Sequence, residues 1–467
     1  DNIESNDLKK IDKNMNVDVL IVGGGIAGLS TLYSLRNSNL KTILVERNKC
    51  GHGVTARSTA KITYLQEKIL GNIRKVYGKD IAYKYLDSQI IAMNRLRDII
   101  SKEKIDCDLK EVKSYLFTTE DKNVKKIEEE YEFLKKASID VKWEDKLPVE
   151  NALKAITVSN TYVFHPLKYL NHLKKKFSNI IYENSKLEKI DKKDDYYECL
   201  VNEYKVRAKY VVIASHYPYF LMPFWLPLKS HVETSYIGAS KNDISQGISA
   251  INIDKPTISF RGHNDYLIYL YNSFMSCNVG NIKSNFEELE HKRKLDYVWS
   301  NKDIITNDYM PFIGRIKDND NTFLMASGFN TWGMTNGTLA GWILSDIIQG
   351  VSNKYEELVA PNRGFNIGKL VKFPIDMTCN IKAMLISGKN NVNNQKVIYK
   401  KIKGTNVAIY TDEKGNEHKV LNKCPHMKCG VVFNEQEKTW DCLCHGSRFN
   451  LDGKCIEGPS NFDISYK

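Results

Sequence analysis

Two short stretches near the C-terminal end of the chain carry four cysteines and two histidines, CPHMKC at 424–429 and CLCH at 442–445. Cys424 with His426, and Cys442 with His445, offer one thiolate and one imidazole from each stretch. Such a set can hold a structural zinc ion, or a [2Fe-2S] cluster with two cysteines on one iron and two histidines on the other. Zinc fingers pair cysteine with cysteine and histidine with histidine, so the mixed pairs favour the cluster over zinc or a metal-free disulfide knot.

A glycine-rich turn near the N-terminus has the spacing of a dinucleotide-binding motif. Residues 17–22 (VDVLIV) form an apolar run typical of a buried parallel strand, and Gly23, Gly25 and Gly28 follow before a helical pattern. The next apolar run ends at Glu46. In such a unit the glycines let the backbone approach a pyrophosphate, and the acid accepts a hydrogen bond from a ribose hydroxyl. The spacing predicts a bound dinucleotide and leaves FAD and NAD open.

A further strand-to-helix pattern comes much later in the chain. Residues 323–327 (FLMAS) run into Gly328, and a helical pattern then continues through Ile343 and Ile347. A helix N-terminus aimed at a ligand there would stabilise negative charge on the pyrimidine end of a reduced flavin. An ordinary strand–turn–helix unit is the alternative that this spacing leaves open.

These stretches, together with 51–61, 211–218 and 308–314, resemble the D-amino-acid oxidase or glycine oxidase superfamily of FAD-dependent oxidoreductases over residues 15–355. The resemblance implies an α/β (α+β) fold with a Rossmann-like FAD-binding domain, discontinuous in sequence, and a substrate domain whose antiparallel sheet covers the flavin. It implies FAD as the cofactor. The residues it places at FAD are Gly23, Gly25, Gly28, Glu46, Arg47, Thr55, Ser58, Thr59, Ala60, Ala214, Gly328, Trp332, Gly333, Met334 and Thr335.

The resemblance does not carry over to the substrate. Where relatives usually place small glycines after a strand of the substrate domain, residues 266–272 read YLIYLYN, so bulky side chains are expected to narrow or reshape the pocket. No catalytic acid or base is assigned. Lys61 and His216 lie in motifs near the flavin, and each fits a structural role as well as a catalytic one.

The C-terminal stretches and the Gly446-Ser447 pair that follows them resemble the Rieske [2Fe-2S] domain family. Cys429 and Cys444 fall where some Rieske proteins join the two cluster loops by a disulfide, and Gly458-Pro459 matches the loop that shields the cluster. The cluster ligands that the resemblance implies are Cys424, His426, Cys442 and His445.

The same resemblance bears on the reduction potential. Hydrogen bonds to the cluster sulfurs raise the potential of a Rieske centre. Ser447 is expected to supply one such bond, but Phe449 stands where the quinol-oxidising respiratory proteins carry a tyrosine. We therefore expect a potential below that of the respiratory proteins.

The domain layout follows from these motifs. Residues 407–410 and 417–421 flank a polar turn and predict a hairpin of a small all-β domain. The expected layout is an FAD-dependent oxidoreductase domain at 15–355, a connector at 356–385 and a Rieske domain at 386–467. Because the Rieske unit is appended after the FAD unit, it is expected to relay electrons without contacting the substrate pocket.

Composition narrows the function class. The net charge of +12 comes from lysines that are mixed with acids along the whole chain, which indicates a solvated surface and no nucleic-acid partner. No run of about 18 apolar residues could span a membrane, and the polar first residues lack a signal core, so we expect a cytoplasmic protein. The cysteines outside the cluster stretches, expected as buried thiols, include Cys50, Cys107, Cys199, Cys277 and Cys379.

Together these features predict a flavin-dependent oxidoreductase. By the resemblance alone, a small amine or amino-acid-like substrate would reduce FAD, and single electrons would pass to the Rieske cluster and then to an unidentified one-electron acceptor. No second glycine motif indicates a separate NAD(P)H domain. The alternative is a redox sensor or electron-transfer protein that keeps both cofactors without turning over a substrate, as the bulky residues 266–272 suggest. The sequence does not favour a Rieske oxygenase, because it shows no histidine pair for a mononuclear iron outside the cluster stretches.

Overall fold

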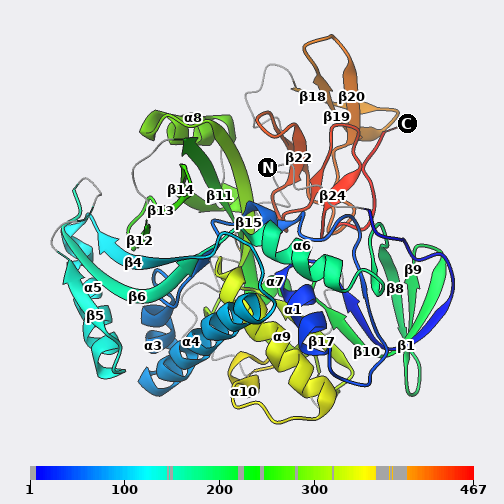
Figure 1. The fold of residues 1–467 in the computed structure, drawn as a ribbon. Helices are drawn as coiled ribbons and strands as arrows, with labels where there is room; N and C mark the ends of the chain where they lie inside the picture. The colour runs from blue at the N-terminus through cyan, green and yellow to red at the C-terminus, as the bar shows by residue number, and fades with distance from the viewer. Residues whose placement is uncertain are drawn as a thin grey trace.

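The computed structural model describes residues 7–144, 147, 151–218, 226–241, 247–278, 282–317, 320–363, 378, 381 and 397–466. Its elements form three groups, namely a sheet with helices packed on it, a second long sheet, and a β-rich C-terminal region (Figure 1). This arrangement confirms the expected α/β (α+β) class with a small all-β C-terminal part. Among the described residues, no helix combines the length and the apolar character that a membrane crossing requires.

The first sheet is built around the strand that precedes the glycine turn. β1 (Met15–Val22) pairs in parallel with β2 (Thr42–Val45) and with β10 (Tyr204–Ile213), which pairs in parallel with β17 (Phe323–Ser327). Their carboxyl ends meet at one edge, where open α/β sheets bind ligands. The other strands of this sheet are β7 (Ile181–Tyr182), β8 (Leu187–Lys192), β9 (Tyr197–Val201) and β16 (Phe312–Arg315).

Two helices that follow these strands lie in close contact. α1 (Ile26–Ser34) follows β1, and α9 (Gly333–Gln349) follows β17. A Cβ at Gly341 would lie 2.4 Å from the carbonyl carbon of Ser30, so a side chain there would push the helices apart. The strand–glycine–helix pattern predicted at 323–347 is thus confirmed. The remaining helices are α2 (Val54–Arg57), α3 (Ile69–Tyr77), α4 (Lys79–Lys102), α5 (Asp121–Lys136), α6 (Pro166–Lys176), α7 (Leu226–Lys229), α8 (Ile282–Lys292) and α10 (Glu356–Val359), with a 3-10 turn at Ser276–Asn278.

The second sheet has the strand order β15-β11-β14-β13-β12-β4-β6-β3, with β5 paired to β6. Its pairings are antiparallel apart from the parallel pair of β12 and β4, in agreement with the expected antiparallel substrate domain. Its strands are β3 (Lys61–Ile62), β4 (Lys110–Thr118), β5 (Val141–Glu144), β6 (Lys154–Val163), β11 (Ser230–Lys241), β12 (Ile248–Asn252), β13 (Ile258–His263), β14 (Tyr266–Met275) and β15 (Tyr297–Thr306).

The C-terminal region contains two small antiparallel sheets around a core that includes the fully buried Trp440 and Phe449. The predicted hairpin at 407–421 is formed by β19 and β20. Of the expected connector 356–385, residues 356–363, 378 and 381 are described; the rest of it and the expected domain start at 386 lie outside the described residues. The strands are β18 (Val397–Ile402), β19 (Thr405–Thr411), β20 (Glu417–Leu421), β21 (Val431–Asn434), β22 (Thr439–Cys442), β23 (Arg448–Phe449) and β24 (Cys455–Glu457).

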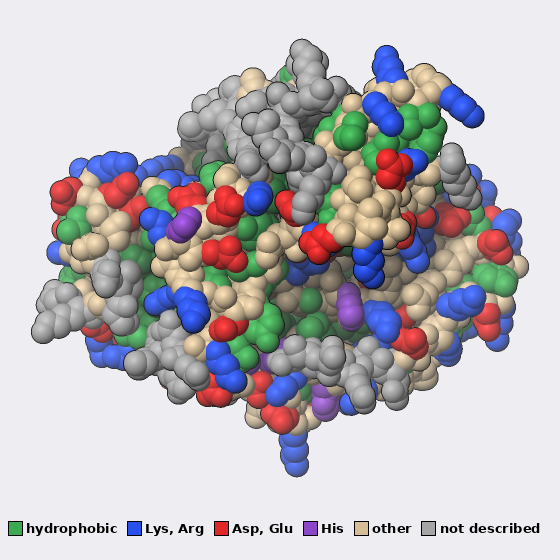
Figure 2. Space-filling view, turned by 90° about the horizontal axis from the view of Figure 1, so that it is seen from above, with side chains coloured by type: hydrophobic (Ala, Val, Ile, Leu, Met, Phe, Trp, Pro, Cys, Tyr) green, Lys and Arg blue, Asp and Glu red, His purple; other side chains and the backbone are tan. Residues whose placement is uncertain are grey.

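The visible surface carries charges of both signs. Acidic and basic side chains are interspersed on the face shown in Figure 2, as the mixed charge pattern predicted.

Cys50, Cys107 and Cys199 are buried free thiols. For Cys277 the expectation was wrong, because this residue is disulfide-bonded. Cys379 lies outside the described residues.

Candidate functional site

The glycine turn between β1 and α1 leaves no room for side chains at two of its three positions. Gly23 has a φ of +113°, and a Cβ there would lie 2.5 Å from the carbonyl oxygen of Ala214. A Cβ at Gly28 would lie 1.9 Å from the carbonyl oxygen of Gly23. Gly25, the N-cap of α1, lines a cavity at the carboxyl edge of the sheet, with Thr55 as the neighbour nearest to a Cβ. The turn therefore presents bare backbone to this cavity, which we call the flavin cavity.

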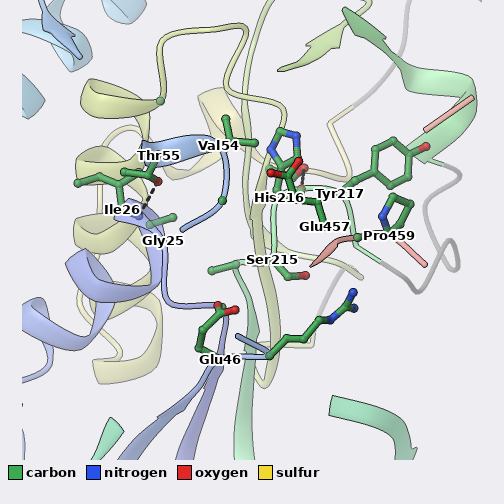
Figure 3. Close-up of a pocket in the computed structure, with 18 of the residues that line it drawn as sticks. Gly25, Ile26, Glu46, Val54, Thr55, Ser215, His216, Tyr217, Glu457 and Pro459 are labelled. Carbon is green, nitrogen blue, oxygen red and sulfur yellow. Dashed lines mark hydrogen bonds between the residues drawn. The ribbon is translucent and has the colours of Figure 1, made fainter. Parts of the chain in front are cut away.

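The flavin cavity contains most of the residues predicted to contact FAD. Thr55 Oγ1 accepts a hydrogen bond from the backbone N–H of Ile26 at 3.3 Å, at the first turn of α1 (Figure 3). Glu46 accepts from the backbone N–H groups of Gly24 at 2.7 Å and Asn48 at 2.9 Å, and burial raises its pKa. Of the predicted set, the residues that line the cavity are Gly23, Gly25, Glu46, Arg47, Thr55, Ser58, Ala214, Gly328, Gly333 and Met334.

A second cavity adjoins the flavin cavity on the side of the antiparallel sheet. Two further predicted residues, Thr59 and Trp332, line this cavity and not the first. Gly28, Ala60 and Thr335 line neither one; Gly28 packs on Gly23, and Thr335 Oγ1 donates to the carbonyl oxygen of Trp332 at 3.3 Å. The residues common to both cavities are Ser58, Asp303, Thr331, Gly333 and Met334.

The bulky stretch 266–272 occupies the second cavity less than the sequence suggested. Of this stretch only Leu270 is among the lining residues. The Tyr271 hydroxyl donates to Glu288 of α8 at 3.1 Å. The tyrosines therefore do not fill the cavity. The alternative of a redox sensor without turnover was based on these bulky residues, so it loses support.

Two residues left without a role in the sequence analysis lie at the cavities. Lys61 lines the second cavity, where its ammonium group donates to Ala250 O at 2.7 Å and to Ser259 Oγ. Burial, followed by repulsion from Arg261, lowers the pKa of Lys61 to about 7. His216 lines the flavin cavity, and burial lowers its pKa to about 4. Both side chains are thus close enough to the cavities to influence bound molecules.

The predicted cluster ligands converge in the C-terminal region. Cys424 and Cys442 are free thiols, 1% and 2% exposed. The rings of His426 and His445 lie with their centroids 5.0 Å apart. Both ring nitrogens of His445 are buried and have no hydrogen-bond partner among the described residues, although buried polar atoms are normally paired. A metal bound to this nitrogen-and-sulfur set would satisfy them, so the residues fit a cluster.

The remaining two cysteines of these loops are joined to each other. Cys429 and Cys444 form a disulfide between the two loops, as the Rieske resemblance implied. The sulfur of Cys442 lies within 4.8 Å of both disulfide sulfurs. Since bonded cysteines cannot act as thiolate ligands, two cysteines and two histidines are left for the metal site. This composition matches a Rieske centre.

The C-terminal region closes one side of the flavin cavity. His445, Gly446, Glu457, Pro459 and Asn461 are among the lining residues, and Glu457 and Pro459 are seen facing the cavity in Figure 3. The appended domain therefore contacts the flavin cavity, whereas the sequence-based expectation concerned only the substrate pocket. None of the described residues that line the second cavity comes from the C-terminal region.

Arg47 shows how the two parts are joined. Its side chain was predicted at FAD and does line the flavin cavity, but the guanidinium donates to Ser460 O at 2.7 Å, to Asn461 Oδ1 and to Cys455 Sγ at 3.3 Å. Arg57 adds an ion pair with Glu457 at 3.0 Å. The contacts of Arg47 link residues more than 400 positions apart, which explains why no local pattern indicated them.

Sequence reasoning missed several residues of both cavities. Tyr217 follows β10 and lines the flavin cavity (Figure 3). The centroid of its ring lies 5.1 Å from that of His445. Asp303 on β15 and Glu233 on β11 line the second cavity. One signal was present for Asp303, because the segment Asn301-Lys302-Asp303 interrupts an otherwise apolar strand. For Glu233 we find no comparable signal.

Comparison with known proteins supports the same two-part division. The family model DAO, FAD dependent oxidoreductase, matches residues 18–347, and the model Rieske [2Fe-2S] domain matches residues 382–465. A chain of Bacillus subtilis (strain 168) named as a Rieske 2Fe-2S iron-sulfur protein, YhfW, is 30% identical over 96% of this chain and 93% of its own length.

More distant similarities concern the first part. Gamma-glutamylputrescine oxidoreductase of Escherichia coli (strain K12) is 21% identical over 78% of this chain and 91% of its own length. The crystal structure of glycine oxidase from Geobacillus kaustophilus superimposes with a TM-score of 0.59 at 14% identity, over 76% of this chain and all of that chain, and so shares the fold. The chain therefore belongs to the DAO family of FAD-dependent oxidoreductases, and it carries a Rieske domain, so that it binds both FAD and a [2Fe-2S] cluster.

Proposed function

We propose that the protein oxidises a small amine or amino-acid-like substrate with its FAD and passes the electrons to its own Rieske cluster, from which a one-electron acceptor removes them. The observation that carries this proposal is the shared flavin cavity, which is lined by Gly25 and Met334 of the FAD-binding part and by His445 of the Rieske part. Flavin can exchange electrons singly or in pairs, whereas an iron–sulfur cluster accepts one at a time.

The residues that would hold FAD present backbone donors to the flavin cavity. Gly25 and Gly333 stand at the N-termini of α1 and α9, and both line it. Helix N-termini carry partial positive charge and unpaired N–H groups, which favour phosphate and a reduced flavin ring. Glu46 directly follows β2 at the same edge and would accept a hydrogen bond from a ribose hydroxyl.

The residues that would hold the cluster are in contact with the wall of the flavin cavity. Cys424 and Cys442 would bind one iron, and His426 and His445 the other. Tyr217 packs against both imidazoles, with centroid distances of 6.0 Å to His426 and 5.1 Å to His445. Packed side chains therefore connect the flavin cavity with the cluster ligands, which supports electron transfer within the chain.

An amine-type substrate is supported by the second cavity and by the relatives. The second cavity adjoins the flavin cavity through Asp303, Thr331 and Met334, so a molecule bound there would lie beside the flavin site. The names of the relatives, glycine oxidase and gamma-glutamylputrescine oxidoreductase, describe enzymes of amino acids or amines.

Replacing His426 with leucine tests the electron path. His426 lines neither cavity, so FAD should be retained while the cluster is lost. Flavin reduction by an amine substrate should then continue near its normal rate. Turnover with a one-electron acceptor should fall at least about 100-fold, because in this proposal the electrons leave through the cluster. Iron and acid-labile sulfide analysis, flavin absorbance and steady-state rates measure the three effects.

The matched control is His291→Leu, which changes an exposed histidine of α8 and should leave all three quantities unchanged. If His426→Leu lacked the cluster and still reduced the acceptor as fast as the parent protein, electrons would not leave through the cluster. His445 is a poorer choice for this test than His426, because His445 also lines the flavin cavity.

Ser447 is expected to tune the cluster. It is fully buried, its side chain lies beside Cys424, and its oxygen accepts from the backbone N–H of Ser460 at 2.9 Å. A hydrogen bond to a charged group contributes about 1.5–3 kcal/mol, and a one-electron couple shifts by about 59 mV per tenfold change in its equilibrium constant. Ser447→Ala should therefore lower the reduction potential by roughly 60–130 mV in voltammetry. The control Ser465→Ala removes an exposed hydroxyl of the same domain and should leave the reduction potential unchanged. If the two variants had the same potential, Ser447 would not be a residue that tunes the cluster.

A further inference from the structure

Strand β15 separates the second cavity from the Rieske domain. Side chains alternate between the two faces of a strand. On one face, Asn301 and Asp303 line the second cavity. On the other face, Ser300 Oγ donates to Glu437, and Lys302 forms an ion pair with Asp441 at 3.0 Å. The polar residues of one strand therefore serve two different sites.

Two carboxylates face each other in the second cavity. Glu233 of β11 and Asp303 of β15 are directly paired in the antiparallel register, and both line the cavity. Like charges in this position destabilise a sheet. Burial and then the charge of Glu233 raise the pKa of Asp303 to about 7. Among the described residues, no ion pair joins Asp303 to a lysine or arginine.

Hydrogen bonds hold both carboxylates in place. Glu233 is contacted by His231 Nε2 at 3.2 Å and accepts from Ser273 Oγ at 3.0 Å. Asp303 Oδ2 accepts from Asn301 Nδ2 at 3.1 Å. Positioned acids of this kind form a binding surface for a cation at little further cost in side-chain entropy.

Asn301 independently indicates that a ligand binds in the second cavity. The residue is 4% exposed and lines the second cavity, and its buried Oδ1 atom has no hydrogen-bond partner in the part of the chain that the structure describes. The donor side of the amide is fixed by Asp303, because the reverse orientation would place two acceptors together. A buried acceptor without a partner is costly. A ligand with an N–H donor would satisfy it.

We propose that Asp303, Glu233 and Asn301 recognise the ammonium group of the substrate. An alkylammonium supplies positive charge for the carboxylate pair and three N–H donors, and all three side chains offer oxygen acceptors. Because Asp303 lines both cavities, the substrate nitrogen would lie beside the flavin cavity. The inference rests on the proposed oxidation of an amine and adds the residues that select it.

The test measures binding to the oxidised holoprotein without turnover. n-Propylammonium is titrated into the protein, with propionamide and propionate as neutral and anionic counterparts, and binding is followed by the flavin absorption spectrum and by calorimetry. Wild type should bind propylammonium in preference to both counterparts. Asp303→Asn and Glu233→Gln should each weaken propylammonium roughly 10- to 100-fold, because each removes a charge-assisted hydrogen bond.

Glu111→Gln is the matched control, since Glu111 is an exposed carboxylate on β4 of the same sheet. FAD content is measured for every variant. If Asp303→Asn loses FAD, Glu233→Gln alone tests the inference, because Glu233 does not line the flavin cavity. Unchanged affinity in the variant that retains FAD, or no binding of propylammonium to wild type, would overturn the inference. Neither result depends on the cluster, so the electron path in the proposed function is judged separately by His426→Leu.

Discussion

Gly28→Ala should abolish FAD retention while leaving the Rieske cluster in place. The added Cβ would lie 1.9 Å from the carbonyl oxygen of Gly23, a backbone atom that cannot rotate away. Either α1 or Gly23 must then move. Both movements displace the backbone of the glycine turn from the position in which it could bind a pyrophosphate. Overpacking of this kind costs about 1–3 kcal/mol or more, so we expect FAD to bind at least roughly 100-fold more weakly.

The measurement is the FAD content per chain after purification, together with the dissociation constant for added FAD. Acid-labile sulfide should remain at the parent level, because the cluster ligands come from the C-terminal loops. Gly71→Ala is the control: Gly71 also lies inside a helix, but the atom nearest to its Cβ would be Arg74 Nη2 at 3.6 Å, an ordinary contact. A Gly28→Ala protein with full FAD content would show that the close approach of α1 to the turn is not needed for binding.

Arg448→Met should destabilise the Rieske domain and its contact with β15 by about 3–5 kcal/mol, the cost of removing one partner from buried ion pairs. Arg448 is fully buried and forms ion pairs with Glu437, with Asp441 at 3.3 Å and with Glu457 at 3.9 Å. Its Nη2 atom also donates to Ser300 Oγ on β15 at 3.3 Å. Methionine fills a similar volume without the charge.

Chemical denaturation and thermal unfolding, followed by cluster and flavin absorbance, measure this loss. The control Arg207→Met removes an arginine whose side chain is 52% exposed and which pairs with Glu198 at 3.3 Å, so it should cost less than about 1 kcal/mol. Equal stability of the two variants would mean that the Arg448 ion pairs do not stabilise the Rieske domain.

The same ion pairs predict how the contact responds to acid. Burial acts to raise the pKa of Asp441, but the charges of Arg448 and Lys302 outweigh it and hold the pKa below its usual range. A carboxylate with a lowered pKa in the folded state stabilises the protein above its unfolded pKa, and this contribution is lost as the pH falls through the folded value. The contact is therefore fully stabilised at neutral pH and weakens only in strong acid.

Short-range patterns were sufficient for the two cofactor motifs. The glycine turn at 23–28 and the strand before it follow from backbone sterics and apolar periodicity within a few residues, and the structure forms both as predicted. The cluster loops likewise carry their ligand types within a few positions of each other. The Cys429–Cys444 disulfide could be expected for the same reason, through the Rieske resemblance.

Partners that are distant in sequence could not be predicted in this way. Arg47 follows Glu46 and was therefore expected at the cofactor, yet its guanidinium also binds the backbone of Ser460, because the C-terminal region folds back onto β2. The bulky residues 266–272 were expected in the substrate pocket, but hydrogen bonding and the register of β14 leave only Leu270 in the lining of the second cavity.

By itself the sequence determined which cofactors the protein carries, because each is specified by a motif in which a few neighbouring residues must have particular shapes or ligand atoms. Only the tertiary structure decided how the two sites communicate and what the second cavity can bind. His445 reaches the flavin cavity, and Glu233 meets Asp303, through a domain contact and a strand register that join residues far apart in the chain. Such pairings depend on the packing of whole sheets, and no local run of residues encodes them.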